Sequence, residues 1–316
     1  MAKSGKRLVV LAVLLATAVC ASLFLGSVPI WKTDASLSVT ILSVLRLPRT
    51  IACLLAGSAL AVSGYVLQAV LANPLASPSI TGIQSGAGLA NLIVCALFPM
   101  SFGLSMPAAF VGAILSSSLI LGLASHFRSS RSTIVLAGLA MGQIFGAGMD
   151  LVLTLVPDAA AGYADFRVGG FAGITSSELV LPGIAIITAI ILIMSCTRQL
   201  EVLMTGEAAT TLGLDTKKWT LILMGLASLL GACVVSFAGL IGFAGLIVPH
   251  IIRRQVDGST LAQLAGCVLG GGAFMIVCDV IARVIAAPFE LPAGILLSLA
   301  GGPYFLWLLF HGKGHG

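Results

Sequence analysis

The chain has 316 residues, of which 59% are hydrophobic and 9% are charged, and its formal net charge at pH 7 is +5. Soluble domains carry about 25% charged residues, so this composition excludes an ordinary soluble enzyme or binding domain and indicates an integral membrane protein. Apolar runs recur along the chain without strand-like alternation, which favours a helical bundle over a barrel.

The first apolar run follows a basic start and resembles a secretory signal, but it is long and lacks a clear cleavage site, so we predict an uncleaved helix. Further apolar runs of about 20 residues, enough to cross a bilayer, follow along the chain. We predict an all-α integral membrane protein, with one transmembrane domain over residues 1–316 and about ten spanning helices. Their predicted bounds are 8–28, 51–71, 80–98, 107–125, 133–156, 179–198, 219–239, 241–253 with a turn at either end, 262–282 and 291–310.

The distribution of Lys and Arg predicts the topology. If the N-terminus is cytoplasmic, most of these residues fall in cytoplasmic segments, as the positive-inside rule requires, and both termini are cytoplasmic. The second and seventh helices then run in opposite directions, which permits an inverted repeat of four helices in each half.

Two places combine proline and glycine at membrane depth. "ANPLASPSITG" (72–82) contains Asn73, Pro74 and Pro78, and "GLIGFAGLIVPH" (239–250) contains Pro249. Interrupted helices of this kind line transport pathways, although a kink whose backbone groups are satisfied by neighbouring helices is an equal alternative.

A polar segment over residues 199–218 contrasts with the apolar chain around it. Its stretch "GEAATTLGL" is rich in helix-forming residues and reaches Gly213, where a helix could end. We predict a short helix and a glycine turn that project from the cytoplasmic face, with a solvated loop as the alternative.

Three blocks resemble a known family. They are "RLPRTIACLLAGSALAVSGYVLQAVLANPLASPSITGIQSGAG" (46–88), "GFAGLIVPHIIR" (242–253) and "DVIARVIAAPFELPAGILLSLAGGPYFLWLL" (279–309). With their spacing, they are similar to the permeases of ABC importers for iron-siderophores, haem and vitamin B12. The resemblance implies a multi-pass protein of the bacterial inner membrane, with ten helices per subunit.

The same resemblance implies partners. A type II importer pairs two permease subunits, identical or related, with two cytoplasmic ATPases that use ATP and magnesium and with a binding protein on the outer face. The permease itself holds no cofactor and contacts no nucleic acid. Iron-siderophore is the first expected substrate, followed by vitamin B12 and haem.

Residue roles follow from the resemblance. The ATPase-coupling motif matches Glu207, Ala208, Ala209, Leu212 and Gly213. Arginines that pair with glutamates of the binding protein match Arg46, Arg49 and Arg283. The alternative for these arginines is interfacial snorkelling, and for Arg283 it is an i,i+4 pair with Asp279.

Two gates are expected on the same basis. Residues 158–177 resemble the short outer gate helix, where the matching positions are Phe166, Gly169 and Gly170. The form "GGFAG" (169–173) resembles the vitamin B12 branch. Ser132 and Thr133 match a constriction on the cytoplasmic side, with a helix N-cap as the alternative.

Other functions find little support in the chain. It has no nucleophile–base pair and no GxxxxGK[ST] motif, so we predict that it is not an enzyme and that another chain hydrolyses ATP. The seven cysteines have no metal-type spacing, and for His250 a structural hydrogen bond is favoured over metal binding. A proton-coupled carrier is the remote alternative, because Asp150 and Asp279 do not form a relay.

Overall fold

The computed structural model describes the chain over residues 2–26, 34–79, 82–99, 101–126, 131–206 and 208–311. Within these ranges every regular element is helical, as predicted. In chain order the elements are α1 (Ala2–Phe24), α2 (Ala35–Thr40), a π-helical segment (Ile41–Arg46), α3 (Leu47–Val70), α4 (Ile83–Leu97), a 3₁₀ turn (Phe102–Leu104), α5 (Ser105–His126), α6 (Arg131–Leu155), α7 (Ala159–Val168), α8 (Ser176–Ser195), α9 (Thr197–Met204), α10 (Ala208–Thr211), α11 (Thr216–Ala238), α12 (Ala244–Gln255), α13 (Thr260–Ile285) and α14 (Ala293–His311).

Each predicted span coincides with a helix, but not every helix is long enough for a full crossing. Among the described residues, seven helices are long and apolar enough to cross a membrane: α1, the continuous helix from α2 through α3, α5, α6, α8, α11 and α13. Helix α4 and the apolar part of α14 are shorter. Helix α12 has 12 residues and extends about 18 Å, against a bilayer core about 30 Å thick.

Helix α3 lies at the centre of the bundle, and its residues are buried along most of its length. It packs against α8, α11, α12 and α13. Small residues permit this crowding, because a Cβ added to Gly57 would lie 2.1 Å from the carbonyl oxygen of Gly271. A Cβ added to Gly64 would lie 1.8 Å from the carbonyl oxygen of Gly245. The backbone of α3 therefore touches those of α13 and α12 directly, as small residues allow between membrane helices.

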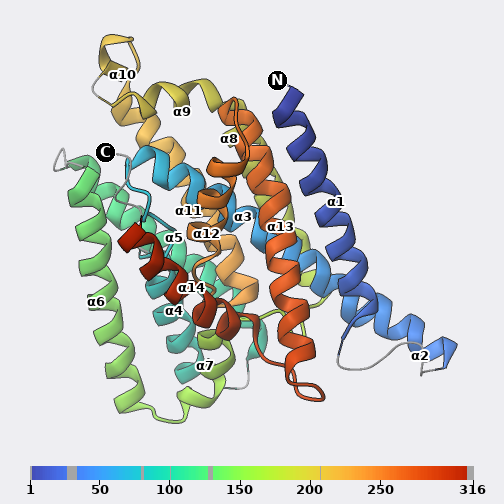
Figure 1. Ribbon diagram of the computed structural model, residues 1–316. Helices are drawn as coiled ribbons and strands as arrows, with labels where there is room; N and C mark the ends of the chain where they lie inside the picture. Colours follow the sequence, from blue (N-terminus) through green and yellow to red (C-terminus); the bar gives the residue numbers. More distant parts are fainter. Residues whose placement is uncertain are drawn as a thin grey trace.

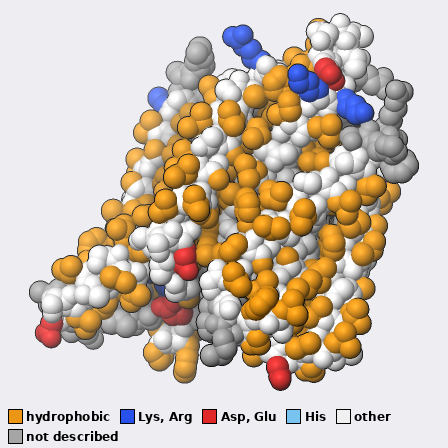
Figure 2. Space-filling view, turned by 180° about the vertical axis from the view of Figure 1, so that it is seen from behind, with side chains coloured by type: hydrophobic (Ala, Val, Ile, Leu, Met, Phe, Trp, Pro, Cys, Tyr) orange, Lys and Arg blue, Asp and Glu red, His pale blue; other side chains and the backbone are white. Residues whose placement is uncertain are grey.

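The bundle has two chemically distinct ends (Figure 1). Helices α9 and α10 and the start of α1 lie at one end, which we call the α10 end. Helix α7, α2 and the connection from α13 to α14 lie at the other, the α7 end. Figure 2 shows hydrophobic side chains over most of the flank, with Lys and Arg gathered near the α10 end on this face. This pattern is typical of a protein whose flank faces lipid.

The predicted interruption after the second span is confirmed. Asn73, Pro74 and Pro78 lie in the non-helical connection between α3 and α4. The side chain of Asn73 accepts a hydrogen bond from the backbone N–H of Leu75 at 2.9 Å, a local turn that stops the helix from continuing.

The predicted helix break at Pro249 is wrong, because α12 continues through this residue. The break lies earlier, over residues 239–243, which separate α11 from α12. Proline has no N–H to donate to the carbonyl four residues before it, here that of Gly245. The side-chain amide of Gln68 in α3 donates to that oxygen at 3.3 Å. A neighbouring helix thus supplies the missing donor, so the helix stays intact.

Candidate functional site

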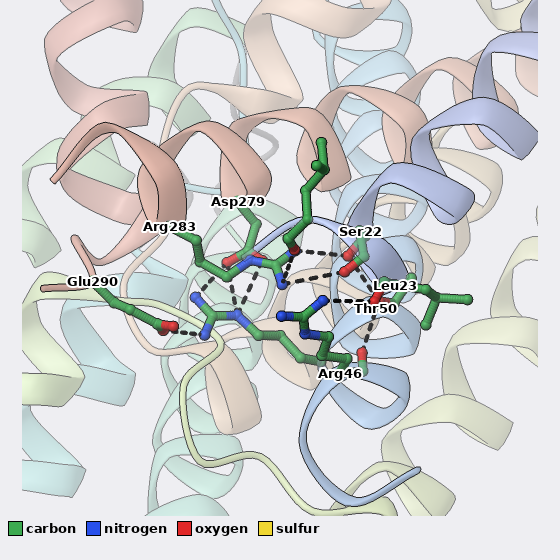
Figure 3. Close-up of polar contacts among 9 residues, drawn as sticks. Ser22, Leu23, Arg46, Thr50, Asp279, Arg283 and Glu290 are labelled. Carbon is green, nitrogen blue, oxygen red and sulfur yellow. Dashed lines mark hydrogen bonds and ion pairs between the residues drawn. The ribbon is translucent and has the colours of Figure 1, made fainter. Parts of the chain in front are cut away.

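Charged side chains from distant parts of the chain meet at the α7 end, where α1, α3 and α13 converge (Figure 3). We call this group the arginine cluster. Its members come from the start of α3, from the last turns of α13 and from the connection to α14; they are Arg46, Arg49, Asp279, Arg283 and Glu290. The cluster contains three of the predicted site residues and brings Arg283 to Arg46 and Arg49, which are more than 200 positions away in the sequence.

Arg46 and Arg283 bind the end of α1. Arg46 Nη1 donates to the carbonyl oxygen of Leu23 at 2.8 Å. Arg283 donates to the Ser22 hydroxyl at 2.8 Å and to the carbonyl oxygens of Ser22 and Leu25, each at 3.3 Å. The last carbonyls of a helix have no N–H partner within it, and positive charge is favourable there. These two arginines therefore cap α1 and attach it to α3 and α13.

Arg49 instead forms ion pairs. Its Nε and Nη2 both donate to the Asp279 carboxylate, at 3.0 and 2.9 Å, and its Nη1 donates to Glu290 at 2.5 Å. The side chain of Asp279 is 0% exposed, that of Arg49 is 11% exposed and that of Glu290 is 34% exposed. Bidentate pairing of this kind is strong, and removing one buried partner leaves an uncompensated charge.

The arginines lie at the predicted end of the bundle, but they are engaged within the chain. Arg46 is 5% exposed and Arg283 is 2% exposed, so snorkelling into an interface does not describe them. The alternative i,i+4 pair is present, with Arg283 Nε 3.0 Å from an Asp279 oxygen. Arg49 is less buried than either. Docking of the binding protein at these residues stays a prediction.

The end of α7 is joined to two other parts of the bundle by backbone hydrogen bonds. The carbonyl of Phe166 accepts from Leu240, and the N–H of Gly170 donates to Ala238, at 3.0 and 2.9 Å. The carbonyl of Gly169 accepts from Gly294 at 3.1 Å. The three predicted gate residues therefore lie where α7 meets the end of α11 and the start of α14.

Gly169 is required by this junction for two reasons. Its φ is +72°, a conformation that side chains disfavour. A Cβ there would also lie 2.7 Å from the carbonyl oxygen of Leu240. The nearby Tyr163 hydroxyl donates to Met149 Sδ of α6 at 3.4 Å, and burial raises the pKa of this phenol. Helix α7 is thus anchored to α6 as well.

The polar segment at the α10 end contains the predicted short helix and glycine turn. Helix α10 holds Ala208 and Ala209, and Gly213 has a φ of +80°. Ala209 is fully buried, whereas Leu212 is 65% exposed at the tip. Glu207 lies outside the described residues. The segment projects from the bundle (Figure 1), so an apolar side chain is presented on a polar surface.

The predicted cytoplasmic gate residues lie at the α10 end of α6. Helix α6 begins at Arg131, so Ser132 and Thr133 belong to its first turn. Both the constriction and its N-cap alternative stay predictions. The side chain of Thr133 is exposed.

Three contributors to these sites were not identified as such from the sequence. Glu290 precedes the Leu291–Pro292 pair after α13, and only the folded chain brings it to Arg49. Asp279 was expected to pair with Arg283, but its bidentate contact with Arg49 spans 230 positions of sequence. Nothing in the sequence around Gln68 indicates its role. Because Pro249 has no N–H, the carbonyl of Gly245 needs another donor, but the sequence does not identify it.

The fold is that of a multi-pass helical transport subunit. A solved structure of a metal-chelate type ABC transporter in an inward-facing conformation superimposes with a TM-score of 0.85 and 28% identity, covering 98% of this chain and 99% of that one.

The model of the FecCD transport family matches residues 13–311, and the chain belongs to this family. It is 36% identical to the hemin transport system permease of Yersinia pestis, over 84% of this chain and 81% of that protein. It is 36% identical to the Fe(3+)-citrate import permease of Bacillus subtilis, over 84% and 80%. It is 34% identical to the vitamin B12 import permease of Yersinia pseudotuberculosis, over 96% and 92%. The chain is accordingly a transport subunit and not an enzyme.

Proposed function

We propose that this chain is the permease subunit of an ATP-driven ABC importer that takes up an iron-siderophore complex across the bacterial inner membrane. The observation that carries this proposal is the match to the FecCD transport family over residues 13–311, together with a helical fold that agrees over nearly the whole chain with a metal-chelate type ABC transporter. The α10 end faces the cytoplasm with both termini, and ten helical segments make up the membrane domain.

The α10 end receives the ATPase. The projecting segment with its exposed Leu212 offers an apolar contact within a polar rim, the arrangement common at interface centres. Glu207 and Gly213 complete this coupling motif. ATP and magnesium are bound by two separate ATPase subunits, which move this segment during transport.

The α7 end receives the substrate-binding protein. Arginine recognises carboxylates through a planar fork and attracts acidic partners from a distance. Arg49, with Arg46 and Arg283 beside it, is placed to meet glutamates of that protein. The segment 166–170 then acts as the outer gate, and Ser132 and Thr133 form the constriction near the α10 end.

A second permease subunit covers the face formed by α6 and α14. Helix α6 exposes Leu136, Leu139 and Leu151, and a Cβ at Gly146 would meet nothing within the chain. Helix α14 likewise exposes Leu299 and Phe310. A closely packed second copy, or a related permease, would use this space and enclose the pathway between the subunits.

The substrate class follows the relatives. Hemin, ferric citrate and vitamin B12 are all large metal-containing compounds, and the chain is 34 to 36% identical to each permease. Vitamin B12 is the first alternative to an iron-siderophore because of the GGFAG stretch, and haem is the second. A proton-coupled carrier remains the remote alternative.

The test is reconstitution. The chain is placed in liposomes with the ATPase and binding protein encoded beside it, and uptake of radiolabelled ferric siderophore, cobalamin and haem is measured with and without ATP. ATP-dependent uptake of the siderophore alone supports the proposal. Uptake of cobalamin or haem alone replaces the substrate, and uptake driven by a proton gradient without ATP overturns the importer assignment.

A further inference from the structure

Arg49 is held by two carboxylates that the protein fixes to different degrees. Asp279 is fully buried, takes two nitrogens of Arg49 and also lies 3.0 Å from Arg283 Nε. Glu290 takes the remaining nitrogen, Nη1, and keeps 34% of its side chain exposed. Figure 3 shows Glu290 on the side of the cluster away from Ser22. Asp279 is part of the buried structure, whereas Glu290 is accessible from outside.

We propose that Glu290 is a displaceable internal partner of Arg49, which a carboxylate of the docking protein replaces when it binds at the α7 end. This inference rests on the proposed docking role of the arginines and goes beyond it by assigning Glu290. It also explains how a guanidinium that is 11% exposed can take part in docking: one of its nitrogens becomes available when Glu290 leaves.

Glu290 is the partner that can leave because it is the more exposed of the two carboxylates and Arg49 does not depend on it alone. Without Asp279, two buried guanidinium groups would lose their counterion, which is costly. Without Glu290, Arg49 keeps its bidentate contact with Asp279, and the Glu290 carboxylate moves into water. An incoming carboxylate then forms the same interaction with Nη1, so the exchange replaces one guanidinium–carboxylate ion pair with another.

Displacement of Glu290 acts on the outer gate through the chain that follows it. A short stretch leads from Glu290 to Gly294, whose N–H donates to the carbonyl of Gly169 at 3.1 Å. A Cβ on Gly294 would lie 2.1 Å from the carbonyl oxygen of Val168, so backbone contacts backbone there. A shift of Glu290 therefore has a path to the end of α7 through continuous, closely packed main chain, one of the physical routes by which two sites are coupled.

The first experiment measures the affinity of the purified binding protein for the full-length chain, assembled with its ATPase in nanodiscs. Five forms are compared: wild type, Glu290→Gln, Arg49→Gln, the double variant, and Asp34→Asn. Asp34 is an exposed acid before α2 at the α7 end, outside the arginine cluster and the gate region 158–177, and controls for the loss of one negative charge. We expect Glu290→Gln to tighten binding about 5- to 20-fold, within the usual range of coupling between sites, and Asp34→Asn to change it less than about 2-fold.

The double variant separates displacement from general electrostatics. If Glu290 competes for Arg49, the gain from Glu290→Gln disappears when Arg49 is already Gln. Unchanged or weaker binding by Glu290→Gln, while Arg49→Gln weakens it, overturns the displacement and leaves the docking proposal standing. Unchanged binding by Arg49→Gln overturns both.

A second measurement follows the gate without any partner present. Hydrogen exchange by mass spectrometry is recorded on peptides covering 163–172 and 290–297 in wild type, Glu290→Gln and Asp34→Asn. Faster exchange of both peptides in Glu290→Gln alone supports transmission to α7. Equal exchange in all three forms overturns the link between Glu290 and the gate.

Discussion

The two ends of this protein differ in how far their charged side chains are buried. At the α7 end, three guanidinium groups and two carboxylates are gathered into contacts with one another and with the end of α1, and most of their surface is buried. At the α10 end, the ion pair of Arg7 and Asp257 is 42% and 70% exposed, and the coupling segment is held by backbone turns. Buried charges fix how helices meet, whereas exposed ones leave a surface open to a partner.

The largest effect is expected from Asp279→Asn. It leaves Arg49 and Arg283 without their shared counterion and should cost about 3–5 kcal/mol of stability, the usual cost of breaking a buried pair. Thermal unfolding can be followed with a thiol-reactive dye, because Cys53, Cys233 and Cys267 are free and buried. The matched change Asp257→Asn should cost less than about 1 kcal/mol. Similar losses in the two variants would contradict the difference between the ends.

The next effect is expected from Gly213→Val, at the α10 end. A branched side chain at a φ of +80° is strained by about 1–3 kcal/mol, so the turn after α10 should rearrange while the bundle stays folded. ATP-driven uptake should fall at least about 10-fold, which corresponds to about 1.4 kcal/mol. Gly225→Val is the control, since a Cβ there meets nothing within 4 Å. Equal uptake by both variants would remove the coupling role.

A smaller effect is expected from Arg46→Gln. It removes a charged hydrogen bond to the end of α1 and should cost about 1–2 kcal/mol, measured by the same unfolding assay. The exposed Arg254 at the α10 end supplies the comparison, because Arg254→Gln should be close to neutral. If Arg46→Gln left stability unchanged but weakened binding-protein docking, Arg46 would be a docking residue and not a cap.

The smallest effect concerns one neutral hydrogen bond near the α10 end. Gln68→Leu should cost about 1 kcal/mol, because the carbonyl of Gly245 loses its donor. In a Pro249→Ala background the alanine N–H can supply that donor itself, so the same change should cost little. A double-mutant cycle measures the difference; additive costs would show that the Gln68 contact is incidental.

The helices could be predicted from the chain because lipid imposes a simple length and polarity rule, and every predicted span coincides with a helix. The predictions failed where a tertiary contact overrode a local signal. Pro249 would break an isolated helix; the structure instead shows the alternative, in which α12 continues and the amide of Gln68 in another helix satisfies the freed carbonyl. Similarly, α12 was predicted as a span by its apolar run, although its 12 residues cross only part of the bilayer.

The candidate sites divide in the same way. The glycine turn at Gly213 is local and follows from its residue type. The arginine cluster is not local: nothing near Arg49 in the sequence indicates Asp279 or Glu290, which are more than 200 positions away. Arg46 and Arg283 were expected to face a partner protein. In the structure they bind carbonyls at the end of α1 instead. The sequence at the end of α1 does not indicate that distant arginines cap it.

The glycine contacts of α3 restrict which parts of the protein can move during transport. Gly57 meets Gly271, and one heptad further along Gly64 meets Gly245, with no side chain in between. Two such backbone contacts prevent α3 from sliding along or turning against α12 and α13, since closely packed interiors do not deform continuously. These three helices therefore form one rigid unit, and any movement in the proposed transport cycle is left to helices outside it, such as α6, α7 and α14.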